Sequence, residues 1–211
     1  MMYHMARYNI HALQTSMNQL SNHDHSRFLT RTSGKTGRLH TVGRAAAEAD
    51  VDKRVMKEAV VFMMTWPGAP TLYYGDEAGL CGWTDPDNRR VFPWGKEDEE
   101  LLQFHREAIA LRQKNTALRT GSVQFLHNEQ GVLSFGRWDE QSNFAVALNN
   151  NDVERALTLP VWKMGCASGT MRVVLATVPC EAETFPVEDG KVQLILPAKS
   201  AVVLEGVVGK E

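Results

Sequence analysis

Apolar residues in the first half of the chain recur at helical spacing in two places. Asp50 is of a residue type that caps helix N-termini, so we expect it to start the first helix. Pro67 and Gly68 should end that helix near Trp66, because neither continues a helix well. The predicted buried stripe consists of Val51, Val55, Ala59, Phe62 and Met63.

The second helix is predicted by both charge and periodicity. Acidic residues at positions 98–100 suit the first turn of a helix, and Lys114 suits its last turn. The apolar stripe between them consists of Leu101, Phe104, Ala108 and Leu111.

Each of these helices is preceded by a short apolar run and a long polar loop. Residues 17–20 form a candidate strand that ends at Ser21, and residues 69–75 ("APTLYYG") form a second one. The second run does not alternate, which suits a parallel strand covered on both faces. The order strand, loop, helix predicts parallel α/β structure, in which functional loops gather at the carboxyl ends of the strands.

From Gly121 onward the helical period disappears. Short β-rich runs such as "VLSFGRW" and "SAVVLEG" are separated by turn clusters such as "NNND" and "VEDGK". This pattern is typical of an antiparallel sheet or sandwich. We therefore predict two units, residues 1–117 and residues 118–211.

Composition excludes several classes of protein. The 211 residues carry a formal net charge of −2, so nothing attracts the whole chain to nucleic acid or to an anionic membrane. No apolar run has the length of a membrane span. Three cysteines suggest neither a disulfide framework nor a metal site, and the histidines lack metal-ligand spacing. We expect no metal site, no cofactor and a cytoplasmic location.

The first polar cluster, "NHDHSR", directly follows the first predicted strand. In one interpretation Asp24 caps the following turn and Arg27 pairs with it. In the other, the cluster binds a polyhydroxyl ligand, because a carboxylate accepts two hydroxyl protons while Arg27 and a histidine donate to sugar oxygens. The cluster alone favours the first interpretation.

The second cluster spans residues 75–94, after the second predicted strand. It is either an exposed loop, in which an Asp85–Arg89 ion pair adds little stability, or a carbohydrate-binding surface. The second interpretation rests on Trp83, Phe92 and Trp94, because aromatic faces stack on sugar rings while Asp and Arg take the hydroxyls. The sequence leaves these two interpretations about equal.

Taken together, these segments resemble the α-amylase family of glycoside hydrolases, especially its cyclomaltodextrinase, neopullulanase and maltogenic amylase members. "LSNHDHSRFLTR" looks like the motif at the end of the seventh barrel strand. "PGAPTLYYGDEAGL" looks like the eighth strand and its exit, and "GWTDPDNRRVFPW" like the loop that follows. The resemblance implies the last strands and helices of a (β/α)8 TIM barrel followed by an antiparallel β-sandwich domain.

The resemblance also implies roles for individual residues. Asp24 would be the third catalytic carboxylate, which holds the hydroxyls of a distorted glucose ring, and His23 would donate to the same ring. Asp85 and Arg89 would bind a sugar further toward the non-reducing end. Arg27 would also bind the substrate, and Tyr74 and Trp83 would stack on its sugar rings.

One feature of the family is missing from the sequence. The nucleophile and the acid/base lie on the fourth and fifth barrel strands, and no segment here matches their motifs; Glu77 belongs to the "YYGDE" turn. A retaining glycosidase needs both carboxylates. We therefore expect a C-terminal fragment of an enzyme that hydrolyses α-glucosidic bonds in starch-like oligosaccharides, inactive alone. Calcium is used by many relatives, but no acidic cation-binding loop is evident.

Two other interpretations remain open from the sequence. The chain is alternatively a non-catalytic carbohydrate-binding remnant, or a purely structural β-domain with part of a barrel attached. Two strands of eight cannot close a barrel. The apolar faces left uncovered predict that the chain self-associates.

Overall fold

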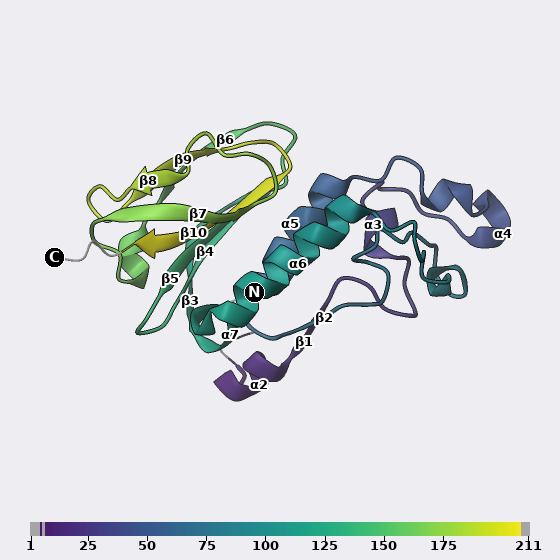
Figure 1. The fold of residues 1–211 in the computed structure, drawn as a ribbon, viewed down its shortest axis with the longest axis horizontal. Coiled ribbons are helices and arrows are strands. Elements are labelled where there is room, and N and C mark those ends of the chain that lie inside the picture. Colours follow the sequence, from purple (N-terminus) through teal and green to yellow (C-terminus); the bar gives the residue numbers. More distant parts are fainter. Residues whose placement is uncertain (1–4, 6, 208–211) are drawn as a thin grey trace.

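The computed structural model describes Met5 and residues 7–207, and these residues form a helical and loop region beside a β-sandwich (Figure 1). The first region contains helices α2 (Ile10–Thr15), α3 (Phe28–Arg31), α4 (Leu39–Val42), α5 (Lys53–Thr65), α6 (Glu99–Lys114) and α7 (Thr116–Thr120). It also contains strands β1 (Met17–Gln19) and β2 (Ala69–Thr71) and the 3-10 turns η1 (Ala45–Ala47) and η2 (Asp87–Arg89). Across all the described residues of both regions, the helices lack the length and the apolar character that a membrane span requires.

Strands β1 and β2 pair in parallel, as predicted. Their register runs from Met17 opposite Ala69 to Gln19 opposite Thr71, and α5 lies between them in the chain. Both strands are only three residues long. The predicted second strand is therefore too long, because residues 72–75 already belong to the loop that leaves β2.

Helix α5 begins two residues later than predicted. Asp52 is its N-cap and accepts a hydrogen bond from the Arg54 backbone N–H at 2.9 Å. Asp50 instead has a φ of +58° and pairs with Lys35. The prediction for Asp50 is wrong because two nearby aspartates compete and only one has the extended backbone of a cap.

The buried face of α5 also differs from the predicted stripe. Of the predicted residues only Met63 is fully buried, and Val51 lies before the helix. The fully buried apolar residues of the helix are Met56, Val60, Val61, Met63 and Met64. Val55, Ala59 and Phe62 are half-buried and lie on another flank, where they line a groove.

Substitution at position 52 tests the corrected helix start. Asp52→Ala should lower the free energy of unfolding by about 1 kcal/mol, the usual value of an N-cap. Asp50→Asn, which keeps a residue type that tolerates positive φ, should change it by less than about 0.5 kcal/mol. Urea denaturation of both variants measures this difference. A larger loss at position 50 than at position 52 would contradict it.

Helix α6 agrees closely with its prediction. Asp98 caps it by accepting from the Leu101 N–H at 3.1 Å. Leu101, Phe104 and Ala108 are buried, as the stripe predicts, while Leu111, its last member, is half-buried. Residues 115–121 then lead through α7 into the sheet, so the predicted boundary between residues 117 and 118 falls inside a short helix.

The second region is an antiparallel β-sandwich, as predicted. Its larger sheet has six strands in the order β3–β4–β5–β10–β7–β8, and β6 pairs with β9 in a second, two-stranded sheet. The strands are β3 (Ser122–Glu129), β4 (Val132–Trp138), β5 (Asn143–Asn149), β6 (Arg155–Leu159), β7 (Thr170–Ala176), β8 (Thr184–Pro186), β9 (Val192–Leu196) and β10 (Ser200–Val207), with the 3-10 turn η3 at Val161–Met164. The two runs quoted above, "VLSFGRW" and "SAVVLEG", are β4 and β10. β8 is an edge strand of three residues that ends in proline.

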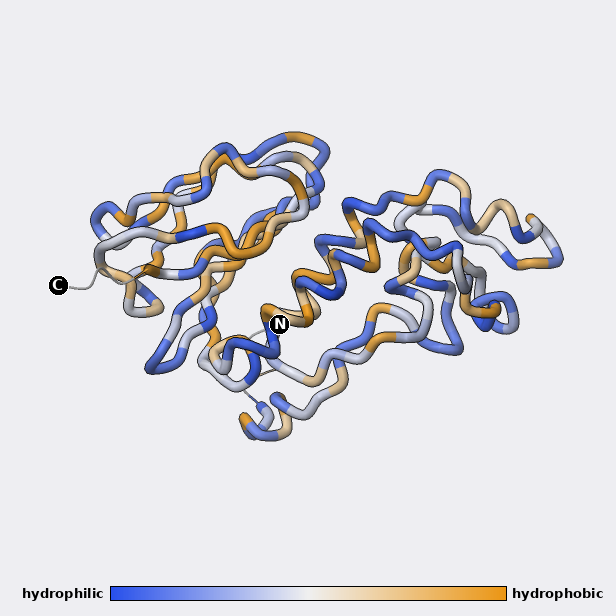
Figure 2. The backbone as a smooth tube through the Cα atoms, viewed as in Figure 1, coloured by the Kyte–Doolittle hydropathy of each residue, from blue (hydrophilic) through white to orange (hydrophobic). Residues whose placement is uncertain are grey.

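The larger sheet carries an apolar core on each of its faces, and hydrophobic residues concentrate along its strands and along α5 (Figure 2). One core lies between the two sheets. The other joins the sheet to the helices: Met56, Val60 and Leu101 belong to the same buried cluster as Phe135 and Val203. The helices therefore pack directly on the β-sandwich and share a core with it.

Two buried arginines reinforce this junction. Arg112 donates to the carbonyl oxygens of Met64 at 2.8 Å and Gly68 at 2.6 Å. Arg112 and Arg137 both donate to the carbonyl oxygen of Leu118, at 2.7 and 3.0 Å. Burial, aided by the Arg112 charge, lowers the pKa of Arg137 to about 9. The guanidinium groups thus satisfy carbonyl groups where α5 ends and the sandwich begins.

Candidate functional site

The turn after β1 is capped by Asn22 and not by Asp24. The Asn22 side-chain oxygen accepts from the backbone N–H groups of Asp24 at 2.9 Å and His25 at 3.1 Å. The Asp24 carboxylate lies 3.4 Å from Nε2 of His23, and its side chain is 68% exposed. The capping interpretation of Asp24 is therefore wrong, and its carboxylate is free to meet a ligand.

The loop after β2 lies against this turn. Asp85 and Arg89 form the predicted ion pair, and both side chains are about half exposed (51% and 49%). Arg89 also donates to the His23 carbonyl oxygen at 3.4 Å, and Asn88 donates to the His25 carbonyl oxygen at 2.8 Å. These contacts join the two polar clusters, which lie about sixty positions apart in the sequence.

Arg27 is fully buried beneath the two loops. Its guanidinium donates to the carbonyl oxygens of Tyr74 at 2.8 Å and Asn88 at 2.9 Å, and to Oδ1 of Asp76 at 3.0 Å. It also lies 4.4 Å from the centre of the Tyr73 ring. Arg27 does not pair with Asp24, and no part of it is exposed to a sugar. The structure gives it a positioning role instead of the predicted direct contact.

The buried partner of Arg27 is Asp76. Burial raises the pKa of Asp76, although hydrogen bonds from Ser21 and Arg27 and the Arg27 charge oppose this shift. Its carboxylate links the start of the first loop, through Ser21, to the exit of β2. Its only signal in the sequence was its place in the "YYGDEAG" segment.

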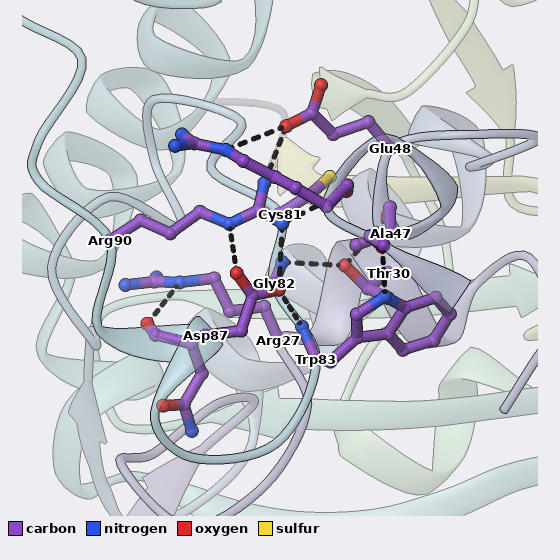
Figure 3. Close-up of polar contacts among 12 residues, drawn as sticks. Arg27, Thr30, Ala47, Glu48, Cys81, Gly82, Trp83, Asp87 and Arg90 are labelled. Atoms are coloured by element: carbon purple, nitrogen blue, oxygen red, sulfur yellow. Dashed lines mark hydrogen bonds and ion pairs between the residues drawn. The ribbon is translucent and has the colours of Figure 1, made fainter. Parts of the chain in front are cut away.

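The predicted aromatic contacts differ in exposure. Trp83 is 1% exposed, and its indole N–H donates to the Gly43 carbonyl oxygen at 3.1 Å (Figure 3). The structure therefore does not support stacking of a sugar on Trp83. Tyr74 is 41% exposed, with its hydroxyl donating to the Arg90 carbonyl oxygen at 2.9 Å. Trp94 is 78% exposed and packs against Phe92, with ring centroids 4.5 Å apart.

A second ion-pair network, which the sequence analysis missed, holds the shape of the β2 loop (Figure 3). Arg90 donates to both carboxylate oxygens of Asp87, at 2.9 and 2.8 Å, and to Glu48 at 2.5 Å. Burial acts to raise the pKa of Asp87, but hydrogen bonds from Arg90 and Trp83 outweigh it and the pKa is lowered. Arg89 and Arg90 are neighbours in the sequence, yet Arg89 lies at the surface and Arg90 is buried.

Close backbone packing completes this loop. Thr30 accepts from the Gly82 N–H at 2.9 Å and donates to the Ala47 carbonyl oxygen at 2.9 Å, while the Gly82 carbonyl accepts from the Arg27 N–H at 2.9 Å. A Cβ at Gly82 would lie 2.6 Å from the carbonyl oxygen of Asp87. Only glycine fits here without moving the η2 turn.

The described residues hold no group of three or more His, Cys, Asp or Glu side chains suited to a metal ion. Asp24 and Asp85 supply exposed carboxylates, while His23 and Arg89 supply donors. Glu77 is different, because its Oε2 is buried without a hydrogen-bond partner in the turn after β2. The exposed carboxylates and donors are together suited to hydrogen bonds with a ligand that both donates and accepts, such as a hydroxyl-rich ring.

Comparison with known proteins decides the family. Residues 1–99 match the α-amylase catalytic domain, and residues 123–207 match the α-amylase C-terminal all-beta domain. The chain belongs to the α-amylase family. Its fold is the end of the catalytic domain of that family followed by the all-beta domain, and its structural neighbours are TIM-barrel amylases.

Individual relatives agree with this assignment. The chain is 41% identical over 122 residues to a cyclomaltodextrinase of a Bacillus species, an alignment that covers 56% of this chain and 22% of that protein. It is 32% identical over 158 residues to neopullulanase 2 of Thermoactinomyces vulgaris (73% and 24%). The debranching enzyme of Nostoc punctiforme, in a crystal structure soaked with acarbose, superposes with a TM-score of 0.73 at 26% identity, covering 98% of this chain and 36% of that one. The chain spans less than a quarter of the length of these two curated relatives.

Proposed function

We propose that this α-amylase family chain binds an α-glucan oligosaccharide at the carboxyl ends of β1 and β2, with Asp24 holding the hydroxyls of one glucose ring. The observation that carries the proposal is the exposed Asp24 carboxylate beside His23, on a turn that Arg89 ties to Asp85. The relatives support the choice of ligand, since they include a cyclomaltodextrinase and an enzyme soaked with acarbose.

In a complete enzyme this site would serve a retaining glycosidase. Asp24 would accept hydrogen bonds from two ring hydroxyls, and these strengthen as the ring becomes oxocarbenium-like, which is worth several kcal/mol. His23 would donate to the same ring, while Asp85 and Arg89 would hold a neighbouring sugar. The nucleophile and acid/base of such an enzyme would have to come from sequence outside these 211 residues, so this chain alone should bind but not hydrolyse.

The first experiment measures binding and hydrolysis separately. Maltotriose titrated into the chain in a calorimeter should give saturable heat, and Asp24→Asn should weaken the affinity about tenfold, or roughly 1.4 kcal/mol. The matched control is Glu140→Gln, an exposed charge in the turn between β4 and β5. Equal affinities of Asp24→Asn and Glu140→Gln would refute the role of Asp24.

Two further outcomes separate this proposal from its alternatives. Release of chromophore from a chromogenic maltooligosaccharide by the isolated chain would overturn the claim that it cannot hydrolyse. If millimolar maltotriose gave no heat of binding, the chain would be better described as a purely structural β-domain that does not bind sugar. Binding without hydrolysis would also fit a non-catalytic carbohydrate-binding remnant, which the same residues would serve.

We also propose that the chain self-associates through the edges of its two-stranded ribbon. Met17 on β1 is 65% exposed, and Ile10 on α2 is 51% exposed. Within the described residues, β1 and β2 pair only with each other. Light scattering over about 5–500 µM should show a mass that rises with concentration, and Met17→Lys should reduce it. A monomer mass throughout would end this proposal.

A further inference from the structure

The outer face of the two-stranded sheet of β6 and β9 lies on the opposite side of the sandwich from α5 and α6 (Figure 1). Alternate residues of the two strands point into the core that they share with the larger sheet: Leu157, Leu159, Val192, Leu194 and Leu196. The other face of the larger sheet packs on the helices. The outer face of β6 and β9 therefore belongs to neither core, and its side chains are exposed.

Trp162 lies where β6 ends and β9 begins. It belongs to the 3-10 turn η3, and 56% of the residue is exposed. Its backbone N–H donates to the Gly190 carbonyl oxygen at 2.9 Å, in the turn that leads into β9. Tryptophan is highly buried on average in folded proteins, so a fixed and exposed one needs a reason.

A tight turn supports the Trp162 ring. Glu188 and Lys191 exchange backbone hydrogen bonds at 2.9 Å, and Asp189 and Gly190 between them have φ values of +49° and +70°. Positive φ at both central positions marks a type I′ turn, for which Asp-Gly is a preferred pair. A Cβ at Gly190 would lie 2.7 Å from Cβ and 3.3 Å from Cδ1 of Trp162. Glycine thus lets the indole lie against the turn while much of the ring stays open to solvent.

Hydrogen-bonding side chains continue from this ring along the outer face. Thr158 lies opposite Gln193, and both are exposed. Gln193 follows Gly190 by three residues, which is roughly 10 Å along a strand. A shallow hollow of about 220 Å³ lies over this part of the sheet, and its lining includes Thr158, Gln193, Ile195 and Glu181. Oε1 of Glu181 accepts from the Ile195 backbone N–H at 3.2 Å, which holds the carboxylate beside the hollow.

The order of these groups suits a saccharide better than a protein partner. A sugar ring has an apolar face that stacks on an aromatic ring, and its hydroxyl groups both donate and accept hydrogen bonds. Thr158 and Gln193 also both donate and accept. The exposed apolar side chains, Trp162 and Ile195, have Gln193 between them along the chain of β9 and its turn. A protein interface has a contiguous apolar centre instead.

We propose that this outer face is a second binding site for an α-glucan chain, with one glucose ring stacked on Trp162. The hydroxyls of the following rings bond to Thr158, Gln193 and Glu181. The choice of α-glucan as ligand rests on the proposed function, whereas the site itself rests on the geometry around Trp162. The two sites share no residue, so each can be removed while the other is kept. The second site holds a polymeric glucan without occupying Asp24.

The test follows the indole N–H signals of the full chain, labelled with ¹⁵N-tryptophan, by NMR. The Trp162 signal is assigned as the one that is lost in Trp162→Phe. Titration with maltoheptaose should shift it saturably at millimolar sugar, and Asp24→Asn should leave this shift intact. Loss of calorimetric binding at Asp24 with the Trp162 shift retained would refute the proposed function and support the second site. No shift of the Trp162 signal would overturn the second site, whatever Asp24 does.

Two variants keep the reporter ring and test its neighbours. Gln193→Ala should raise the maltoheptaose concentration at half of the shift about fivefold, because hydrogen bonds to the sugar are lost. The matched control is Gln130→Ala, an exposed amide in the turn between β3 and β4, which should leave that concentration unchanged. Equal values in the two variants would contradict the proposed path of the glucan along β9.

Sedimentation with insoluble starch gives an independent measurement on the unlabelled chain. Trp162→Ala should weaken retention about tenfold, and Trp162→Phe, which keeps an aromatic ring, should recover part of it. Retention that is the same in Trp162→Ala as in the unaltered chain would overturn the proposal. So would a Trp162 signal that moves with protein concentration in the absence of sugar, because a second copy of the chain would then cover this face.

Discussion

Replacing Arg27 by methionine should destabilise the chain by about 3–5 kcal/mol, because it leaves Asp76 as a buried carboxylate without its cation. Both residues are almost completely inaccessible, and Arg27 also ties together Tyr74 and Asn88 through their carbonyl groups. The substitution therefore removes an ion pair and the hydrogen bonds that join the two loops. Urea denaturation followed by circular dichroism measures the loss.

The matched control is Arg106→Met, an exposed arginine on α6. It should change the free energy of unfolding by less than about 0.5 kcal/mol. The double variant Arg27→Met/Asp76→Asn should recover part of the stability lost in Arg27→Met, because its buried group is neutral. If Arg27→Met were no more destabilising than Arg106→Met, the buried pair would not be what holds these loops.

The second large effect is a dependence of stability on pH that originates at Glu58. Its pKa rises from an ordinary value of 4.5 to about 8 in the folded chain. The folded state therefore holds this proton more tightly than the unfolded state does. The stability it contributes is complete below about pH 4.5 and is lost as the pH rises through about 8, with a slope of at most about 1.4 kcal/mol per pH unit.

Subtracting a variant isolates this contribution from the other carboxyl groups. The stability of the natural chain relative to Glu58→Gln should fall by roughly 2–4 kcal/mol between about pH 5 and pH 8. The same comparison with Glu107→Gln should be flat. Chemical denaturation at a series of pH values gives the curves, and a difference that rose with pH would have the wrong sign for a buried neutral glutamate.

The elements that the sequence predicted well are those in which local signals agree. In α6 the cap, the acidic first turn and the apolar stripe all indicate the same helix, and the structure confirms it. In α5 the signals conflict, because Asp50 and Asp52 both suit a cap and the helix has apolar residues on two flanks. Tertiary packing decides which flank faces the sheet, and a single sequence does not carry that information.

The candidate site shows the same division. That His23 and Asp24 would lie near Asp85 and Arg89 followed from the rule that parallel strands place their exits at one edge. Which charged or aromatic side chains face inward did not follow from any local rule. Arg27 and Trp83 are buried by contacts with Asn88 and Gly43, which lie far away in the chain. Polar loops of this length build small interiors of their own, and composition alone does not distinguish their inner residues from their outer ones.

The core that the helices share with the larger sheet has a consequence for building chimeras between related enzymes. A crossover at Gly121 would follow the apparent domain limit, yet it would separate Met56 and Leu101 from Phe135 and Val203, which pack in one cluster. A graft that begins before Lys53 would transfer both sides of that interface together. Chimeras joined before Lys53 should therefore express as soluble protein more often than chimeras joined at Gly121.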